Sequence, residues 1–221
     1  MDAPLKRFKP EQVALLVIDM QRDFCHPQGY AAQAGLDVTR LAGPIAQIER
    51  VLHAARRAGW CVVHTREGHL PDLSDCPPEK LRRSQQAGAT IGSQGPLGRL
   101  LVRGEYGHDF VDELQPLYGE TVIDKPGYGA FIHTELEDVL HARSVRCLVL
   151  CGVTTEVCVH STLREAVDRG YACVTLSDAT AASEPALQTP ALAMIGVEGG
   201  IFGSVMNTED VLTHLRLEAP A

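Results

Sequence analysis

Cys158 is a candidate nucleophile because of where it stands in the run Cys151-Gly-Val-Thr-Thr-Glu-Val-Cys158. The apolar residues before it predict a buried strand, and residues 156–169 predict an amphipathic helix that Thr154 or Thr155 could cap. A cysteine in the first turn of a helix lies among unpaired backbone N–H groups at the positive end of the helix dipole, which favours thiolate over thiol. A cysteine that merely fills a core gives the same pattern.

Two further residues of chemical interest come directly after predicted strands: Asp19 follows the apolar run 13–18, and Lys125 follows residues 121–124. Ligands of open α/β sheets bind beyond the carboxyl ends of the strands, where distant residues meet. Asp19 could accept the thiol proton while Lys125 holds a positive charge beside both groups. An aspartate that only caps a turn and a lysine that is only a solvated loop charge remain the alternatives.

The same arrangement would support acyl transfer. Backbone N–H groups of Thr154 and Cys158 could bind the oxyanion that forms when sulfur attacks a carbonyl carbon. Asp19 could then pass its proton to the departing amine and activate the water that releases the acyl group.

Strands alternate with helices along the chain, which predicts one α/β domain with a mostly parallel sheet covered by helices on both faces. The whole chain, 1–221, is expected to form this domain, with loosely held ends at 1–10 and 217–221. Predicted strands cover 13–18, 60–65, 121–124, 145–151, 171–176 and 201–205, and predicted helices cover 44–58, 109–114, 134–142, 156–169, 187–197 and 209–215. Residues 67–108 show no strong period, and a loop of that length is usually functional or an insertion.

Composition narrows the class of protein. A net charge of −8 argues against nonspecific binding to nucleic acid and docking on anionic membranes. The seven cysteines show no paired C-x-x-C spacing, so neither a zinc ribbon nor a thioredoxin motif is supported. The beginning of the chain shows no signal-like apolar stretch, and no apolar run approaches about 18 residues. A reducing cytoplasm is the expected location.

Three motifs around these residues resemble the isochorismatase-like cysteine hydrolase superfamily. They are Leu16-Val-Ile-Asp-Met-Gln-Arg-Asp-Phe24, Lys125-Pro-Gly-Tyr-Gly-Ala-Phe131 and the run Gly152–Ala166, and the likeness covers roughly residues 11–206. The resemblance implies a catalytic triad of Asp19, Lys125 and Cys158. It also implies a three-layer αβα, Rossmann-like fold with a six-stranded sheet, a cis peptide at Val153–Thr154, and a homodimer or homotetramer.

The retained cysteine points to the amidase branch of that superfamily: nicotinamidases, N-carbamoylsarcosine amidases, ureidoacrylate amidohydrolases, and biuret or triuret hydrolases. The loop runs His64–Leu73, Gly88–Gly92 and Gly95–Arg99 resemble the biuret hydrolases most. Those enzymes have glutamine where this chain has Glu198, a position thought to face the substrate. A carboxylate only accepts hydrogen bonds, which leaves room for triuret. A Glu198 that only caps or salt-bridges a helix end is the alternative.

The prediction is thus a cofactor-free cysteine amidohydrolase that acts on a small ureide, converting triuret to carboxybiuret or biuret to allophanate with release of ammonia. Alternatives are a nicotinamidase, an N-carbamoyl amino acid or ureidoacrylate amidohydrolase, and a non-catalytic scaffold. The metal-binding Asp-x-His pattern of nicotinamidases is missing at 64–69, so no metal is expected. Weaker predictions for the pocket are Phe24 and Phe131 as walls, Glu198 facing the substrate, and Tyr30 and Arg66 at the mouth.

Overall fold

A computed structural model describes residues 4–218, and its central feature is a six-stranded sheet in the order β5-β2-β1-β6-β7-β8. All neighbouring strands in this sheet run parallel, as the sequence predicts. Its strands are β1 (Val13–Ile18), β2 (Cys61–Glu67), β5 (Thr121–Lys125), β6 (Cys147–Val153), β7 (Ala172–Ala181) and β8 (Ser204–Met206). A separate antiparallel pair joins β3 (Gln94–Gly95) to β4 (Gly98–Arg99).

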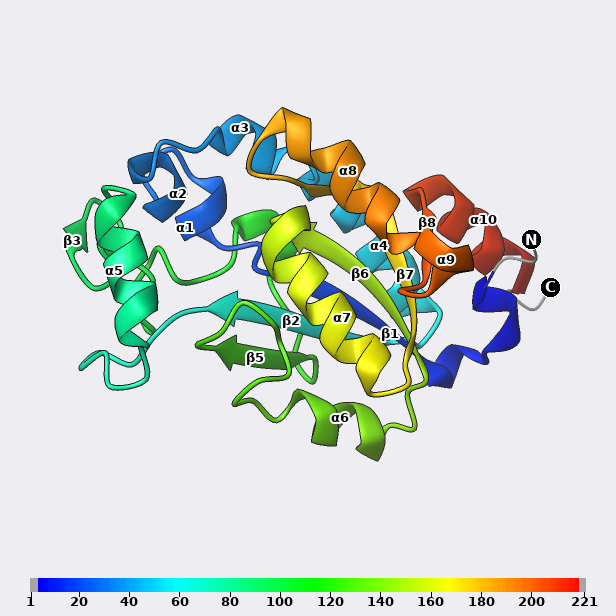
Figure 1. The fold of residues 1–221 in the computed structure, drawn as a ribbon. Coiled ribbons are helices and arrows are strands. Elements are labelled where there is room, and N and C mark those ends of the chain that lie inside the picture. The colour runs from blue at the N-terminus through cyan, green and yellow to red at the C-terminus, as the bar shows by residue number, and fades with distance from the viewer. Residues whose placement is uncertain (1–3, 219–221) are drawn as a thin grey trace.

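Helices cover both faces of the sheet, giving the expected three layers (Figure 1). One face packs against α4 (Ile45–Arg57) and α10 (Thr208–Glu218), and the other against α6 (Leu136–Ala142), α7 (His160–Asp168) and α8 (Pro185–Ile195). The shorter elements are η1 (Pro4–Arg7), η2 (Pro10–Gln12), α1 (Arg22–Cys25), α2 (Tyr30–Gln33), α3 (Val38–Ala42), α5 (Pro78–Gln86), η3 (Asp112–Leu114), η4 (Thr155–Val159) and α9 (Val197–Gly200). No helix within residues 4–218 is long and apolar enough to cross a membrane.

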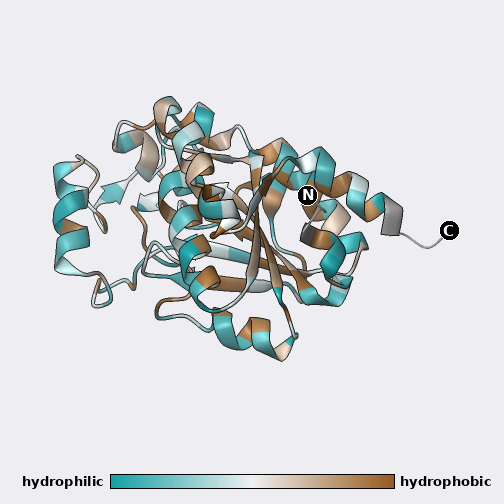
Figure 2. Cartoon of the chain, turned by 45° about the vertical axis from the view of Figure 1, so that its right-hand side comes forward, coloured by the Kyte–Doolittle hydropathy of each residue, from teal (hydrophilic) through white to brown (hydrophobic). Residues whose placement is uncertain are grey.

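The strands are central because both of their faces are apolar. Every residue of β1 and β6 is buried, and successive side chains of each strand enter opposite cores. Figure 2 shows the consequence, with hydrophobic strands inside and helices whose hydrophilic residues lie outward. Each fully buried leucine or isoleucine side chain contributes roughly 1.5–3 kcal/mol through removal of apolar surface from water.

The structure differs from the sequence prediction mainly in residues 19–43 and 67–108. The short helices α1, α2 and α3 and the nine-residue helix α5 form there, although the sequence shows no clear period in either stretch. The chain start also differs from expectation, because Leu5 is fully buried within η1. Residues 1–3 and 219–221 of the predicted loose ends lie outside the described residues.

The segment 67–108 covers the carboxyl end of the sheet and is held there by polar contacts. The Asp23 carboxylate accepts hydrogen bonds from the backbone N–H groups of Leu101, at 2.9 Å, and Tyr30, at 3.2 Å. The Arg103 side chain donates to the Gly68 carbonyl oxygen at 3.1 Å and pairs with Asp75. These bonds satisfy backbone groups of an irregular segment that no sheet or long helix could satisfy.

Candidate active site

Four polar residues meet beyond the carboxyl ends of neighbouring strands. Asp19 follows β1, Glu67 ends β2, Lys125 ends β5, and Cys158 lies in the turn after β6. The register places Glu67 directly beside Lys125 and Ile18 beside Gly152. Gly152 has φ of 112°, and a Cβ there would collide with the backbone carbonyl oxygen of Ile18, so this close approach of β1 and β6 requires glycine.

Asp19 is fully buried and fixed from three directions. Its backbone has φ of 53°, a conformation that non-glycine residues adopt rarely and mostly where the surroundings enforce it. Its N–H donates to the Thr65 carbonyl oxygen at 3.1 Å, and the Thr65 hydroxyl donates to Asp19 Oδ1 at 2.6 Å. Asp19 Oδ2 lies 2.7 Å from Lys125 Nζ. The carboxylate is therefore preorganised as an acid or base.

The ammonium group of Lys125 is also fully buried. It donates to the carbonyl oxygens of Gly127 and Tyr128, each at 3.0 Å, so the Pro-Gly-Tyr-Gly loop after β5 folds around it. With Asp19 these contacts use all three ammonium hydrogens. Despite burial, the Asp19, Cys158 and Glu67 groups raise the pKa of Lys125 above its ordinary value, so it stays charged.

Cys158 lies in a π-helical turn, η4, rather than in the first turn of an α-helix as the sequence predicts. The Val157 and Val159 N–H groups both donate to the Thr154 carbonyl oxygen, at 3.2 and 3.1 Å, and the Cys158 N–H between them does not share this acceptor. Single π-turns of this kind are frequent at functional sites. The peptide Val153–Thr154 is cis, as the resemblance implies.

Glu67 is a fourth site residue that the sequence analysis missed. Its side chain is 4% exposed, and the Cys158 thiol donates to its Oε2 at 3.3 Å. Its Oε1 lies 2.7 Å from Nζ of Lys80, which α5 delivers from the irregular segment. Glu67 lies two residues beyond the predicted strand 60–65, so the rule that selected Asp19, a polar residue directly after an apolar run, did not select it.

The second lysine, Lys80, is as enclosed as the first, with 5% of its surface exposed. It donates to the Pro126 carbonyl oxygen at 2.6 Å and lies 4.8 Å from the centre of the Tyr128 ring. The loop after β5 thus contacts both ammonium groups. Two carboxylates and two ammonium groups balance one another, which is the condition for burying so many charges.

The electrostatic state of the free site differs from the expectation of a ready thiolate. Burial, together with the charges of Asp19 and Glu67, raises the pKa of the Cys158 thiol well above its ordinary value, and Lys125 only partly offsets this. Burial likewise raises the pKa of Asp19 against the influence of Lys125. Burial also opposes ionisation of Glu67, but Lys80 and Lys125 together lower the pKa of this residue. In the free site Cys158 is therefore a thiol that lies between two different carboxyl groups.

The weaker predictions for the pocket separate into two groups. The Phe24 and Tyr30 rings pack edge to face with centroids 6.1 Å apart. Burial, together with the negative charge of Glu67, raises the pKa of the Tyr30 hydroxyl. Arg66 instead pairs with Asp124 and Asp109 over the Phe110 ring.

Phe131 and Glu198 also lie elsewhere. The Phe131 ring packs against Tyr171 and Arg169, near the far end of α7 from Cys158. Glu198 is exposed in α9, just before the amino end of β8, whereas the triad lies beyond the carboxyl ends of the strands. Within this chain Glu198 does not line the site.

One oxygen or sulfur atom each from Asp19, Glu67 and Cys158 lies within 4.8 Å of the other two, a separation that could accommodate a metal ion. Both carboxylates, however, already have an ammonium partner at 2.7 Å. The nearby histidines are engaged elsewhere: His64 contacts Glu120 at 3.0 Å and His69 contacts Asp75 at 3.2 Å. The expectation of a metal-free site stays a prediction.

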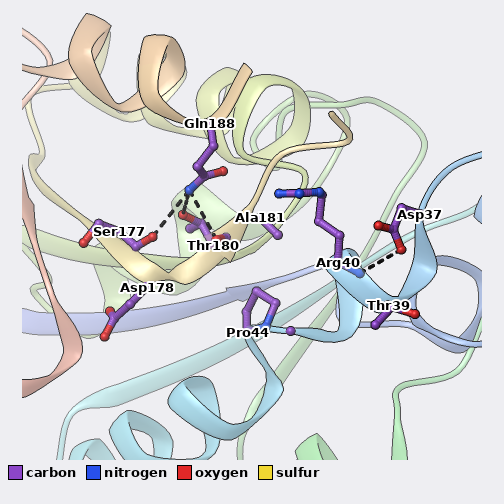
Figure 3. A pocket seen from close by; sticks show the side chains of 10 residues that line it. Asp37, Thr39, Arg40, Pro44, Ser177, Asp178, Thr180, Ala181 and Gln188 are labelled. Atoms are coloured by element: carbon purple, nitrogen blue, oxygen red, sulfur yellow. Dashed lines mark hydrogen bonds between the residues drawn. The ribbon is translucent and has the colours of Figure 1, made fainter. Parts of the chain in front are cut away.

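A cavity of about 420 Å³ lies beside η4, between α3 and the end of β7 (Figure 3). It contains none of the triad residues. Its wall residue Gln188 accepts a hydrogen bond from the Thr155 hydroxyl at 2.8 Å and from the Ala182 N–H at 2.7 Å. Gln188 therefore ties the first residue of η4 to the chain after β7, which helps to hold the turn in place.

Comparison with known proteins identifies the family to which the chain belongs. A model of the isochorismatase domain matches residues 13–210. The chain belongs to the isochorismatase family. It is 38% identical over 214 residues to the ureidoacrylate amidohydrolase RutB of Cronobacter turicensis, covering 95% of this chain and 92% of that protein. The corresponding enzyme of Cronobacter sakazakii is 37% identical, with 97% and 93% covered.

Solved structures show the same fold. A cysteine hydrolase from Pseudomonas syringae pv. phaseolicola superimposes with a TM-score of 0.80 at 30% identity, covering 98% of this chain and 99% of that one. N-carbamoylsarcosine amidase from Thermoplasma acidophilum gives 0.69 at 25% identity, with 90% and 97% covered. The predicted family and the three-layer fold with its six-stranded sheet are confirmed.

Proposed function

We propose that this protein is a cysteine-dependent amidohydrolase that cleaves a carbon–nitrogen bond at the carbamoyl group of a small ureide. The observation that carries the proposal is the enclosed cluster in which Cys158 Sγ lies among Asp19, Glu67 and Lys125. Ureidoacrylate is the first candidate substrate, because relatives with that named activity share 38% and 37% identity over nearly the whole chain.

Attack begins when the thiol proton passes to the Asp19 carboxylate and sulfur bonds to the carbonyl carbon. The carbonyl electron pair moves to oxygen, and the backbone N–H of Cys158, together with that of Thr154, stabilises the resulting oxyanion. Collapse of this intermediate breaks the carbon–nitrogen bond, and Asp19 returns its proton to the leaving nitrogen. Water then attacks the thioester with Asp19 as base, which frees the thiol.

Lys125 serves every step without moving. It holds the Asp19 carboxylate at 2.7 Å and keeps a positive charge next to the developing thiolate. Because its remaining hydrogens go to two carbonyl oxygens of one loop, the charge cannot swing away. Phe24 and Tyr30 are the proposed walls of the pocket on the α1–α2 side.

Biuret or triuret is the second candidate, and the pairing of charges favours it. Ureidoacrylate carries a carboxylate, which calls for a free cation in the pocket. The two buried lysines at the thiol are already paired with Glu67 and Asp19, and Arg66 is paired with Asp124. A neutral ureide needs hydrogen-bonding groups but no counter-ion.

The test is an ammonia-release assay across ureidoacrylate, biuret, triuret, an N-carbamoyl amino acid and nicotinamide, with products identified by mass spectrometry. Cleavage at either side of the carbamoyl carbon gives ammonia, directly or through unstable carbamic acid. We expect turnover of at least one ureide and none by Cys158→Ser, whose circular dichroism should match the unmodified protein. Release from nicotinamide alone would contradict the ureide assignment, and activity in Cys158→Ser would contradict the nucleophile.

A homo-oligomer and a reducing compartment complete the proposal. Large apolar side chains at the β8 edge are exposed in the single chain, namely Leu187, Met194, Val197, Ile201 and Val205. Such a group of exposed apolar residues supports self-association. All seven cysteines are free thiols, which supports a reducing environment such as the cytoplasm.

A further inference from the structure

We propose that Glu67 is an additional catalytic residue whose Oε2 holds the thiol hydrogen in the free enzyme and accepts an N–H of the substrate carbamoyl group during attack. Lys80 is its positioning residue. The inference rests on the proposed ureide hydrolase function and deepens it, because it assigns the group that recognises the nitrogen on the reacting carbon.

The position of Glu67 Oε2 carries the argument. It lies 3.3 Å from Sγ, the atom that must bond to the carbonyl carbon. The nitrogen on that carbon is only one bond further from the sulfur, so an oxygen already in contact with Sγ is within reach of that N–H. A carboxylate can accept this hydrogen bond but can donate none. Substrates with N–H at the reacting carbon are therefore favoured over esters.

Glu67 is held for this task by groups on both of its ends. The Gln21 side chain accepts from the Glu67 N–H at 2.7 Å and donates to the Glu67 carbonyl oxygen at 3.0 Å. Lys80 takes Oε1 at 2.7 Å, while Lys125 lies 3.7 Å from Oε2. Oε2 is thus the Glu67 oxygen that is turned to the thiol, and the Glu67 carboxylate is fixed before any substrate arrives.

This exchange of hydrogen-bond partners at Glu67 explains how a protein that holds a thiol in the free state can still form the thiolate when substrate binds. While Glu67 accepts from the thiol, its charge opposes thiolate formation. When the substrate N–H takes over Oε2, the thiol hydrogen loses that acceptor and Asp19 becomes the remaining one. The nucleophile is then activated by the substrate that it attacks, and the free protein keeps a less reactive thiol.

Several charged or titratable groups face Glu67 and must be considered in any pH profile. They come from the strand ends, from α5 and from the loops packed on them: Asp19, Tyr30, His69, Cys76, Lys80, Lys125 and Cys158. A pH profile of the unmodified protein cannot separate the contributions of these groups, so the test compares variants by three measurements.

The first readout needs no ureide. Removing the negative charge in Glu67→Gln should lower the thiol pKa and raise the iodoacetamide alkylation rate at neutral pH about tenfold for each pKa unit. Asp19→Asn removes the other negative charge that raises the thiol pKa, so it should raise the alkylation rate as well. A Glu67→Gln rate no higher than that of the unmodified protein would overturn the proposal, because Glu67 would then not oppose thiolate formation in the free enzyme. If the unmodified protein turned over no ureide, the proposed function would be wrong, but the alkylation rates would still test the role of Glu67.

The second readout compares a ureide with p-nitrophenyl acetate, which has no N–H at its carbonyl carbon. Glu67→Gln should lose about tenfold to hundredfold in kcat/KM for the ureide, the worth of a hydrogen bond to a charged group. Its reaction with the ester should be equal or faster. Equal losses for both substrates would show a merely structural role and overturn the proposal. Should Glu67→Gln fail to fold, Glu67→Asp, which withdraws the oxygen from sulfur, must show the same selective loss.

The third readout addresses Lys80. Lys80→Met should move the acidic limb of the kcat/KM profile to higher pH, because Glu67 loses the ammonium that keeps it ionised, and Lys80→Arg should restore it. Arg82→Met on the same helix is the matched control: Arg82 is half exposed, pairs with Glu79 on the helix surface, and should leave the profile unchanged. An identical shift in Lys80→Met and Arg82→Met would reduce Lys80 to a helix-stability role.

Discussion

The two ends of the central sheet are built from different chemistry. At the amino end, three helices enter strands through left-handed residues, Gly59, Ser144 and Gly170, with only backbone hydrogen bonds. At the carboxyl end, buried carboxylates and ammonium groups meet between strands. At the amino end the chain turns from helix to strand without burying charges. At the carboxyl end the protein loses some stability because it holds charged side chains in fixed, buried positions.

The amino-end closure repeats the same bonding pattern. The N–H groups of Trp60, Val145 and Tyr171 donate to the carbonyl oxygens five residues earlier, at 3.0, 3.0 and 3.1 Å. This is the Schellman arrangement, which satisfies the last carbonyl groups of a helix without any side chain. The same motif also ends α2 and α5, at Gly35 and Gly88, but at the carboxyl ends of β1 and β2 the side chains of Gln21 and Thr65 bond to the backbone.

The largest expected effect comes from breaking the carboxyl end itself. Lys125→Met should abolish measurable turnover and lower the free energy of unfolding by about 3–5 kcal/mol, because it leaves fully buried Asp19 without its ammonium partner. Urea unfolding followed by circular dichroism measures the loss. The double variant Asp19→Asn with Lys125→Met should regain part of the stability and none of the activity. Unchanged stability in the single variant would show that the ion pair is not buried in solution.

A sequence alone predicts the triad but not the whole cluster, and the reason is physical. Asp19, Lys125 and Cys158 adjoin strands whose apolar runs are unmistakable, and parallel strands bring their carboxyl ends together. Lys80 sits instead on α5, a helix with nearly all-polar composition whose place is set by tertiary contacts. No local sequence pattern predicts which of the many charged residues in such a segment is buried.

The same reasoning explains Glu67 and Glu198. Glu67 ends a strand that extends two residues beyond its apolar run, so no pattern in the sequence marks it as part of the sheet end. Glu198 stood beside glycines in a motif, but the topology puts those residues before the amino end of β8. Motif likeness locates a residue in the chain, whereas only the strand order locates it relative to the thiol.

A smaller effect should follow from acid, acting on the segment that covers the carboxyl end. Burial, reinforced by Arg66 and Arg103 and opposed by Asp124 and Asp109, lowers the pKa of His108 to about 4 from its ordinary value of 6.5. The folded protein therefore resists protonation that the unfolded chain accepts. Above pH about 6.5 the contribution of His108 to the free energy of unfolding is fully present. It is lost as the pH falls toward 4, because the unfolded chain takes up a proton that the folded protein does not, and the loss is roughly 3 kcal/mol at most.

Stability curves for the unmodified protein and His108→Asn between these pH values measure that contribution. The difference between the two proteins should change with pH in this window and become constant above it. His53→Asn is a suitable control, since the imidazole of His53 is exposed, with only a long contact to Glu49 at 3.8 Å. Parallel curves for the unmodified protein and His108→Asn would mean that His108 titrates normally.

The smallest expected effect concerns the helix-to-strand turns at the amino end of the sheet. Ser144 has φ of 55° where the two equivalent turns use glycine, and its side chain is exposed. A left-handed conformation costs a non-glycine residue roughly 1–2 kcal/mol, and glycine recovers most of this at the price of a more flexible unfolded chain. Ser144→Gly should therefore stabilise the fold by about 0.5–1 kcal/mol and raise the Tm by about 1–4 °C. Gly170→Ser, the reverse change at the matching turn, should destabilise it by a similar amount, and neither variant should alter kcat/KM. A lower Tm in Ser144→Gly would show that the amino end, too, depends on a side chain.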